Sequence, residues 1–239
     1  RGPGREIQFS PSTADLGPII NITANNCSLK GFIVRSHANC LTETAITVRG
    51  KFSKMDKLYV VGPGQTTNGN TCRGVVFEGG DYHELYNMEI EKFGDCALGT
   101  DDKSDEHANG SPREISIFGG NFYLNGSHGF HLHGKTGAVL GSTTRYIRIL
   151  HGANIHDNIL QGVHSGSNVH GVLIDDTVLL HGNNSGGEQV LLNGTGHYAG
   201  QEFVQQIWDH PISSATTVGS VGEFINKKLL TVAKYLGLK

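Results

Sequence analysis

The sequence predicts an all-β fold, a parallel β-solenoid of roughly seven coils, with an amphipathic helix at its C-terminal end. Glycine is frequent, at 34 of 239 residues, while only 17% of the residues are charged. Short segments of alternating apolar residues recur through residues 1–210. No stretch of this region has the 3.6-residue periodicity over about ten residues that a helix-containing repeat would need. Together these observations favour stacked short strands over helical repeats.

One series of segments sets the repeat. Each member has a small residue, alternating apolar positions and then glycine or a polar turn. The members are TAITVRG (44–50), GVVFEGG (74–80), DCALGTD (95–101), GFHLHG (129–134), GVHSG (162–166) and QVLLNG (189–194). Their first apolar residues are separated by 29, 21, 34, 33 and 27 residues. Period-2 alternation at such steps is typical of a parallel β-solenoid, with longer insertions looping out at the turns.

Two further series interleave with the first. The second contains SLKGFIV (28–34), KLYVVG (57–62), ELYNMEIE (84–91), EISIFGG (114–120), YIRILHG (146–152) and HGVLIDD (170–176). The third contains NFYLN (121–125), ANIHDN (153–158) and DTVLL (176–180). Three short strands per repeat therefore recur in fixed order. Turn asparagines and glycines are expected to supply the positive φ angles of the tight corners.

The tail differs from the repeats. Residues 211–219 form a small-residue linker, and the solenoid is expected to end at residue 210. Ser220 and Glu223 match a capping box, and apolar residues follow at steps of three and four up to Leu236. This pattern predicts an amphipathic helix within 211–239, which either caps the last coil or contacts another subunit. The N-terminal segment reads as a solenoid interior, so we expect an upstream region before Arg1.

Charge and hydropathy exclude some classes of partner. The net charge of −3 and the pI of about 6.5 argue against nucleic acid or an anionic membrane as a partner, since both need a basic surface. No apolar run approaches the ~18 residues of a membrane span, so no membrane insertion is expected. The four cysteines have no zinc-type spacing.

Strand alternation predicts a polar outer face on the sheet made by the first series. If Val75, Phe77, Leu98 and Phe130 point inward, their neighbours point outward. The expected outer column includes Thr47, Val76, Gly99, His131, His164 and Leu191. The catalytic candidates on or beside this face are Glu78, Asp101, Asp102, His131 and His133, and the candidates for substrate binding are Arg49, Asp81, Lys135, His164 and Asn193. Two carboxylates on neighbouring coils suit glycoside hydrolysis. An imidazole base with a nearby cation suits elimination instead.

No cofactor is required by this interpretation, although two weak metal patterns are present. His131, His133 and His164 could hold zinc or a similar ion. Asp101, Asp102 and Asp105 could hold calcium.

The coil pattern, including NNCSLKGFIV at 25–34, resembles the right-handed parallel β-helix proteins of the pectin-lyase-like superfamily. The opening GPGREIQFSPST looks most like phage tailspikes and polysaccharide depolymerases. That resemblance implies a homotrimer that binds, and often cleaves, a bacterial surface polysaccharide. GDCALGTDD (94–102) and SHGFHLHG (127–134) are also similar to polygalacturonase segments. This likeness would give Asp95 and His128 catalytic roles, although Gly94 replaces the first aspartate of that family's pair.

The sequence therefore predicts a carbohydrate-directed, tailspike-like solenoid in a virion or outside the cell, which acts by hydrolysis or elimination. The alternative is a non-catalytic structural or adhesive solenoid of a virion or cell surface. A secreted lyase of the pectate type would add a calcium site.

Overall fold

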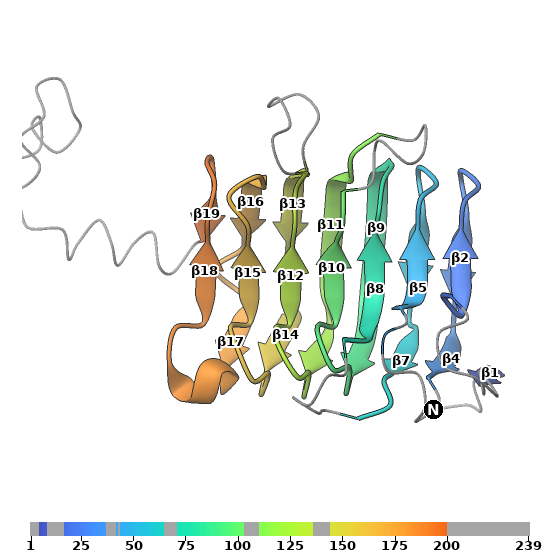
Figure 1. The fold of residues 1–239 in the computed structure, drawn as a ribbon, viewed down its shortest axis with the longest axis horizontal. Helices are drawn as coiled ribbons and strands as arrows, with labels where there is room; N and C mark the ends of the chain where they lie inside the picture. The colour runs from blue at the N-terminus through green and yellow to red at the C-terminus, as the bar shows by residue number, and fades with distance from the viewer. Residues whose placement is uncertain are drawn as a thin grey trace, which may run out of the picture. The chain divides into compact units, whose positions relative to one another are not determined.

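The computed structural model describes residues 5–8, 17–36, 42, 44–64, 71–102, 110–135 and 144–199 of the 239-residue chain. These residues form a mostly β structure, a parallel β-solenoid of about five turns, with no α-helix among them. The predicted solenoid is thus confirmed, and Figure 1 shows its coils side by side. The turn count is lower than the expected seven.

The chain divides into two compact units, Arg1–Tyr198 and Ala199–Lys239. Ala199 is the last described residue. The predicted boundary at residue 210, the linker and the amphipathic helix after Ser220 therefore lie outside the described residues and stay predictions. Within the described part, no helix has the length and apolar character needed to cross a membrane.

The first predicted series forms a seven-stranded parallel sheet. Its strands, in spatial order, are β18 (Val190–Leu192), β15 (Val163–Ser165), β12 (Phe130–Leu132), β10 (Leu98–Thr100), β8 (Arg73–Phe77), β5 (Thr44–Val48) and β2 (Ile20–Ile22). Each strand pairs with the strand one coil away, so residues about 20 to 35 positions apart in sequence become neighbours.

The other two series share a twelve-stranded parallel sheet. Its main path is β1 (Arg5–Gln8), β4 (Phe32–Arg35), β7 (Tyr59–Val61), β9 (Asp81–Glu91), β11 (Arg113–Tyr123), β13 (Arg145–Ile149), β16 (His170–Ile174) and β19 (Tyr198–Ala199). The remaining strands are β3 (Ser28–Lys30), β6 (Lys54–Asp56), β14 (Ala153–His156) and β17 (Leu179–His181). The long strands β9 and β11 each pair with two short strands of a neighbouring coil.

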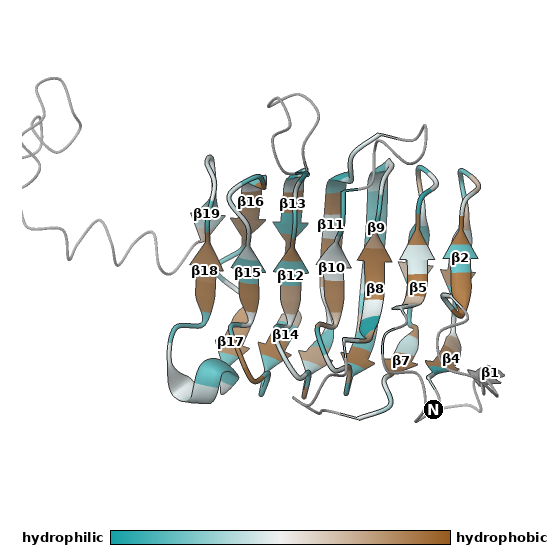
Figure 2. Ribbon diagram, viewed as in Figure 1, coloured by the Kyte–Doolittle hydropathy of each residue, from teal (hydrophilic) through white to brown (hydrophobic). Residues whose placement is uncertain are grey.

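The solenoid interior is a stack of apolar side chains. Val75, Phe77, Leu98 and Phe130, predicted to point inward, are fully buried. Apolar segments lie along the strands of the seven-stranded sheet in Figure 2. Phe122 of the larger sheet meets Phe130 edge to face, with ring centroids 4.7 Å apart. Adjacent coils thus bury each other's apolar rows, which is the main stabilising term of a solenoid.

The corners are turned by residues with positive φ at matching positions of successive coils. The first corner contains Phe52, Tyr82, Glu114, Tyr146 and Gly171. The second contains Gly31, Lys57, Asn87, Gly119 and Gly152. The third contains Lys92, Leu124, Asp157 and Gly182. The expectation that glycine and asparagine supply these angles is only partly correct, because aromatic, charged and aliphatic residues also adopt them. The left-handed conformation costs such residues roughly 1–2 kcal/mol each, and the stacked coils hold them in it.

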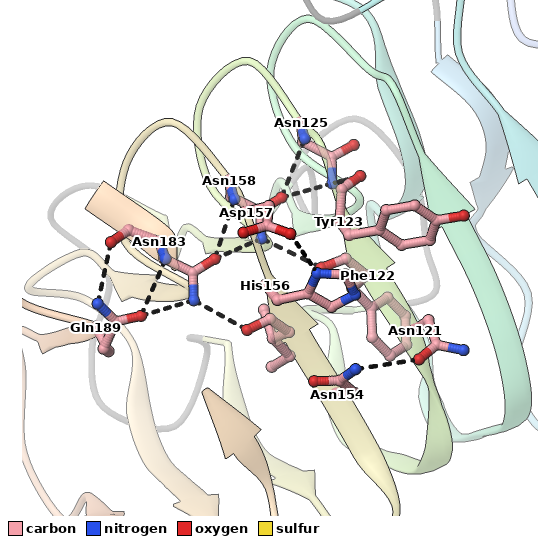
Figure 3. A network of polar contacts seen from close by, with 11 residues as sticks. Asn121, Phe122, Tyr123, Asn125, Asn154, His156, Asp157, Asn158, Asn183 and Gln189 are labelled. Carbon is pink, nitrogen blue, oxygen red and sulfur yellow. Dashed lines mark hydrogen bonds and ion pairs between the residues drawn. The ribbon is translucent and has the colours of Figure 1, made fainter. Parts of the chain in front are cut away.

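Three turn asparagines serve a different purpose. Asn125, Asn158 and Asn183 are at most 2% exposed and form a ladder inside the third corner (Figure 3). The Asn158 side-chain oxygen accepts from the Asn125 backbone at 3.1 Å and from its side chain at 2.8 Å. Asn183 repeats this arrangement toward Asn158, and Gln189 ends the ladder at 2.8 Å from Asn183. The ladder satisfies backbone N–H groups that the corner would otherwise bury unpaired.

Candidate functional site

The predicted column on the seven-stranded sheet stacks in register. One register position in successive coils is occupied by Thr47, Val76, Gly99, His131, His164 and Leu191. The polar character expected of this column holds only in part. Thr47 is 3% exposed and Val76 is fully buried, so the accessible part of this column begins near His131.

Four histidines gather on this part of the face. His131 of β12 and His164 of β15 are register partners with ring centroids 5.1 Å apart. His128, in the turn before β12, lies 4.4 Å from the His131 ring and 4.8 Å from the His164 ring. The exposed His133 ring lies 4.0 Å from that of His131. The solenoid therefore brings together residues that are 33 positions apart in the chain.

Asp95 and two neighbouring polar groups orient this cluster. Asp95 Oδ1 lies 3.4 Å from His131 Nδ1, a contact distance suited to a carboxylate–imidazole pair. His128 is buried, with Ser127 Oγ 2.8 Å from its Nδ1 and Gln161 Oε1 3.1 Å from its Nε2. The resemblance that proposed Asp95 and His128 thus identified two members of one cluster. Ser127 and Gln161 were not predicted, although each lies beside a glycine of the repeat.

The environment favours the neutral form of three of the four imidazoles, those of His128, His133 and His164. Burial, reinforced by the nearby imidazoles of His131 and His164, lowers the pKa of His128 to about 3. Burial and His131 also lower the pKa values of His133 and His164. Burial opposes ionisation of Asp95, but the hydrogen bond and charge of His131 outweigh it and lower the net pKa of Asp95. The site therefore combines an ionised Asp95 carboxylate with neutral rings at His128, His133 and His164.

A second column beside the first carries the predicted carboxylates. The ladder of backbone hydrogen bonds continues through Arg49, Glu78, Asp101, His133, Gly166 and Asn193, each of which donates its N–H to the neighbouring coil. Arg49 Nε lies 2.6 Å from Glu78 Oε2, and that carboxylate side chain is 8% exposed. Arg73 Nη1 lies 3.7 Å from Asp101 Oδ2, whose side chain is 36% exposed. Glu78 and Asp101 are thus one coil apart, each with an arginine partner.

The remaining predicted site residues are not members of the histidine cluster. Asp81 begins β9 of the larger sheet, where it pairs with Arg113 at 3.2 Å and Lys51 at 3.4 Å. Asp102 is buried, and Lys135 is partly exposed beyond the end of β12. Asn193 donates from its side chain to the Ser165 carbonyl at 3.0 Å. The geometry therefore concentrates the site on Asp95, the four histidines and the Glu78–Asp101 row.

Potential metal ligands form two groups among the described residues. One contains His128, His131 and His164, and the other contains His156, Asp157 and His181 on the larger sheet. The first differs from the predicted zinc set, because His128 takes the place of His133. The predicted calcium set includes Asp105, which lies outside the described residues.

Comparison with known proteins found no match. No protein-family description, curated protein or solved structure matches this chain. The fold and the site geometry are therefore the basis for inferring its function.

Proposed function

We propose that this chain is a carbohydrate-directed β-solenoid that binds a polysaccharide on the outward face of the seven-stranded sheet and cleaves its glycosidic bonds. The observation that carries the proposal is the row of Arg49, Glu78, Asp101 and His133, which offers one polar side chain per coil and meets the histidine cluster at His133. Such a row can contact successive units of an extended polymer. Charged side chains and imidazoles supply the donors and acceptors that sugar hydroxyl and carboxylate groups need.

Cleavage is assigned to the carboxylates of the row. Parallel strands lie about 4.8 Å apart, so carboxyl groups on adjacent coils can reach the separations of roughly 5 to 9.5 Å that glycosidases use. Asp101 is the more exposed of the two and is the group placed to reach a substrate. Glu78, held by Arg49, supplies the second carboxylate. Elimination is the competing chemistry, in which Lys135 or an arginine would bind a uronate carboxylate.

The handedness of the solenoid, its superfamily, its oligomeric state and the role of its C-terminal helix are part of the same proposal. Parallel strands joined by crossovers are right-handed in about 98% of cases, which favours a right-handed solenoid. The repeat pattern favours the pectin-lyase-like superfamily and a tailspike-like homotrimer in a virion or outside the cell. We propose the C-terminal amphipathic helix as a cap or subunit contact. Light scattering of the full chain should give the mass of a trimer, and a monomer would overturn the tailspike assignment.

A depolymerisation assay tests the proposed activity. The full chain is incubated with neutral and uronate-containing bacterial polysaccharides, and new reducing ends and unsaturated ends are measured separately. Asp101→Asn should lower cleavage by about 100-fold or more, while saccharide binding changes only a few-fold. Asp56→Asn is the matched control, since it removes a carboxylate that pairs with Lys30 at 2.9 Å on the larger sheet.

The outcomes separate the hypotheses. Reducing ends without unsaturated ends indicate hydrolysis, and unsaturated ends indicate elimination. Equal losses in Asp101→Asn and Asp56→Asn would overturn the catalytic assignment. Binding without cleavage of a bound polysaccharide would favour the alternative, a non-catalytic adhesive solenoid.

A further inference from the structure

The histidine cluster has the composition of a transition-metal site. Its three closest members come from two consecutive coils, and their candidate ligand nitrogens all lie within 4.8 Å of one another. Two of them, His131 and His164, are fixed by the parallel register of β12 and β15. The third, His128, is fixed by burial in the turn before β12. The backbone therefore positions all three rings.

We propose that His128, His131 and His164 bind one zinc-like divalent cation. Three imidazoles are a ligand set found in zinc sites that keep an open fourth position. With Zn–N distances of about 2.0–2.1 Å, tetrahedral ligand nitrogens lie about 3.3 Å apart. The rings therefore need only small side-chain rotations to close around the ion. Calcium is a poor fit because it takes oxygen ligands.

Asp95 is the residue that orients the site. Its carboxylate lies 3.4 Å from Nδ1 of His131. A carboxylate on one imidazole nitrogen fixes the tautomer and leaves the other nitrogen to bind the metal. Asp95 is thus a positioning residue rather than a ligand, and its removal should weaken metal binding without abolishing it.

His164 provides an independent observation. Its Nδ1 is buried, and the described residues offer that atom no hydrogen-bond partner. A buried polar atom without a partner destabilises the fold, and a metal bond or an altered ring orientation would offset that cost. His128 differs, because both of its ring nitrogens have partners. Metal binding would replace its contact with either Ser127 or Gln161.

The open fourth position defines what the bound ion could take. Because His131 and His164 occupy outward register positions, this position would accept water or an oxygen ligand such as a carboxylate or hydroxyl group. The metal proposal is independent of saccharide cleavage, since the cation alone is the probe. A chain that binds zinc but no polysaccharide would support this proposal and still contradict the proposed function.

Calorimetric titration of the untagged, chelator-treated full chain with Zn²⁺ tests the site. We expect tight binding by His128, His131 and His164, which His164→Gln and His131→Gln each weaken at least tenfold. Asp95→Asn should weaken it about 10- to 100-fold. His151→Gln, which removes an exposed imidazole outside both ligand groups, should leave the affinity unchanged. Circular dichroism checks that each variant is folded.

Two further measurements make the result decisive. His181→Gln disables the group on the larger sheet, so a tight site that survives this change must lie elsewhere. Co²⁺ bound at the proposed site should show the intense visible absorption of a tetrahedral complex, which His164→Gln removes. The proposal is overturned if the wild type binds no Zn²⁺, or if folded His164→Gln and His131→Gln both bind as tightly as the wild type.

Discussion

Replacing Asn158 by alanine should be among the most destabilising changes in the described solenoid. The Asn158 side chain makes four hydrogen bonds: its oxygen accepts two from Asn125, and its amide donates to Phe122 O and to Asn183 Oδ1. The residue is 2% exposed, so water cannot replace these partners. At about 1 kcal/mol net for each bond, Asn158→Ala should cost about 4 kcal/mol, a large share of the typical 5–15 kcal/mol of a folded domain.

A matched control separates the ladder from asparagine content in general. Asn121 on β11 is exposed and makes one long contact, 3.4 Å from the Asn154 amide (Figure 3). Asn121→Ala should therefore cost about 0.5 kcal/mol or less. Urea unfolding followed by far-UV circular dichroism gives the midpoint of each variant. If Asn158→Ala shifts the midpoint no more than Asn121→Ala does, the ladder is not a stabilising element and the reasoning fails.

Two further changes test other parts of the solenoid. Burial lowers the pKa of His83 to about 4 from its ordinary 6.5, so the unfolded chain takes up a proton first as the pH falls. The free energy of unfolding is then highest above about pH 6.5 and falls by about 3 kcal/mol toward pH 4. Urea unfolding at these two pH values should show a smaller fall for His83→Leu than for the wild type. An equal fall would contradict this assignment. A Cβ on Gly62 would lie 2.2 Å from Lys92 O. Gly62→Ala should therefore cost about 2–3 kcal/mol, whereas Gly166→Ala, 3.7 Å from the nearest atom, should be neutral by thermal unfolding.

The fold could be predicted because its main determinants are local and periodic. Alternation with period 2 and turn residues at each repeat predicted the strands, and the assumption that equivalent segments stack predicted the column from Thr47 to Leu191. The corners could not be predicted in the same way. Phe52, Tyr82 and Leu124 have positive φ, although their side chains disfavour it. Packing between coils imposes those angles, and a local sequence pattern does not indicate such packing.

The candidate site was predictable in its position but not in its details. The histidines of β12 and β15 follow from strand alternation, whereas His128 was suggested only by resemblance to a known family. Its contact with Gln161 depends on the length of the turn before each strand. The burial of Thr47 and Val76 also escaped prediction, because alternation fixes the direction of a side chain and not what covers it.

The Asn ladder and the histidine cluster are built by the same stacking, and their difference indicates which of them is structural. In the ladder, the side-chain amides of Asn125, Asn158 and Asn183 all find partners within the solenoid. In the cluster, His164 keeps a buried nitrogen that the described residues do not satisfy. A group retained only for stability is expected to be satisfied by the fold itself. The unsatisfied imidazole of His164 lies within 4.8 Å of candidate ligand nitrogens of His128 and His131, and the zinc titration of His164→Gln tests whether an exogenous ion joins them.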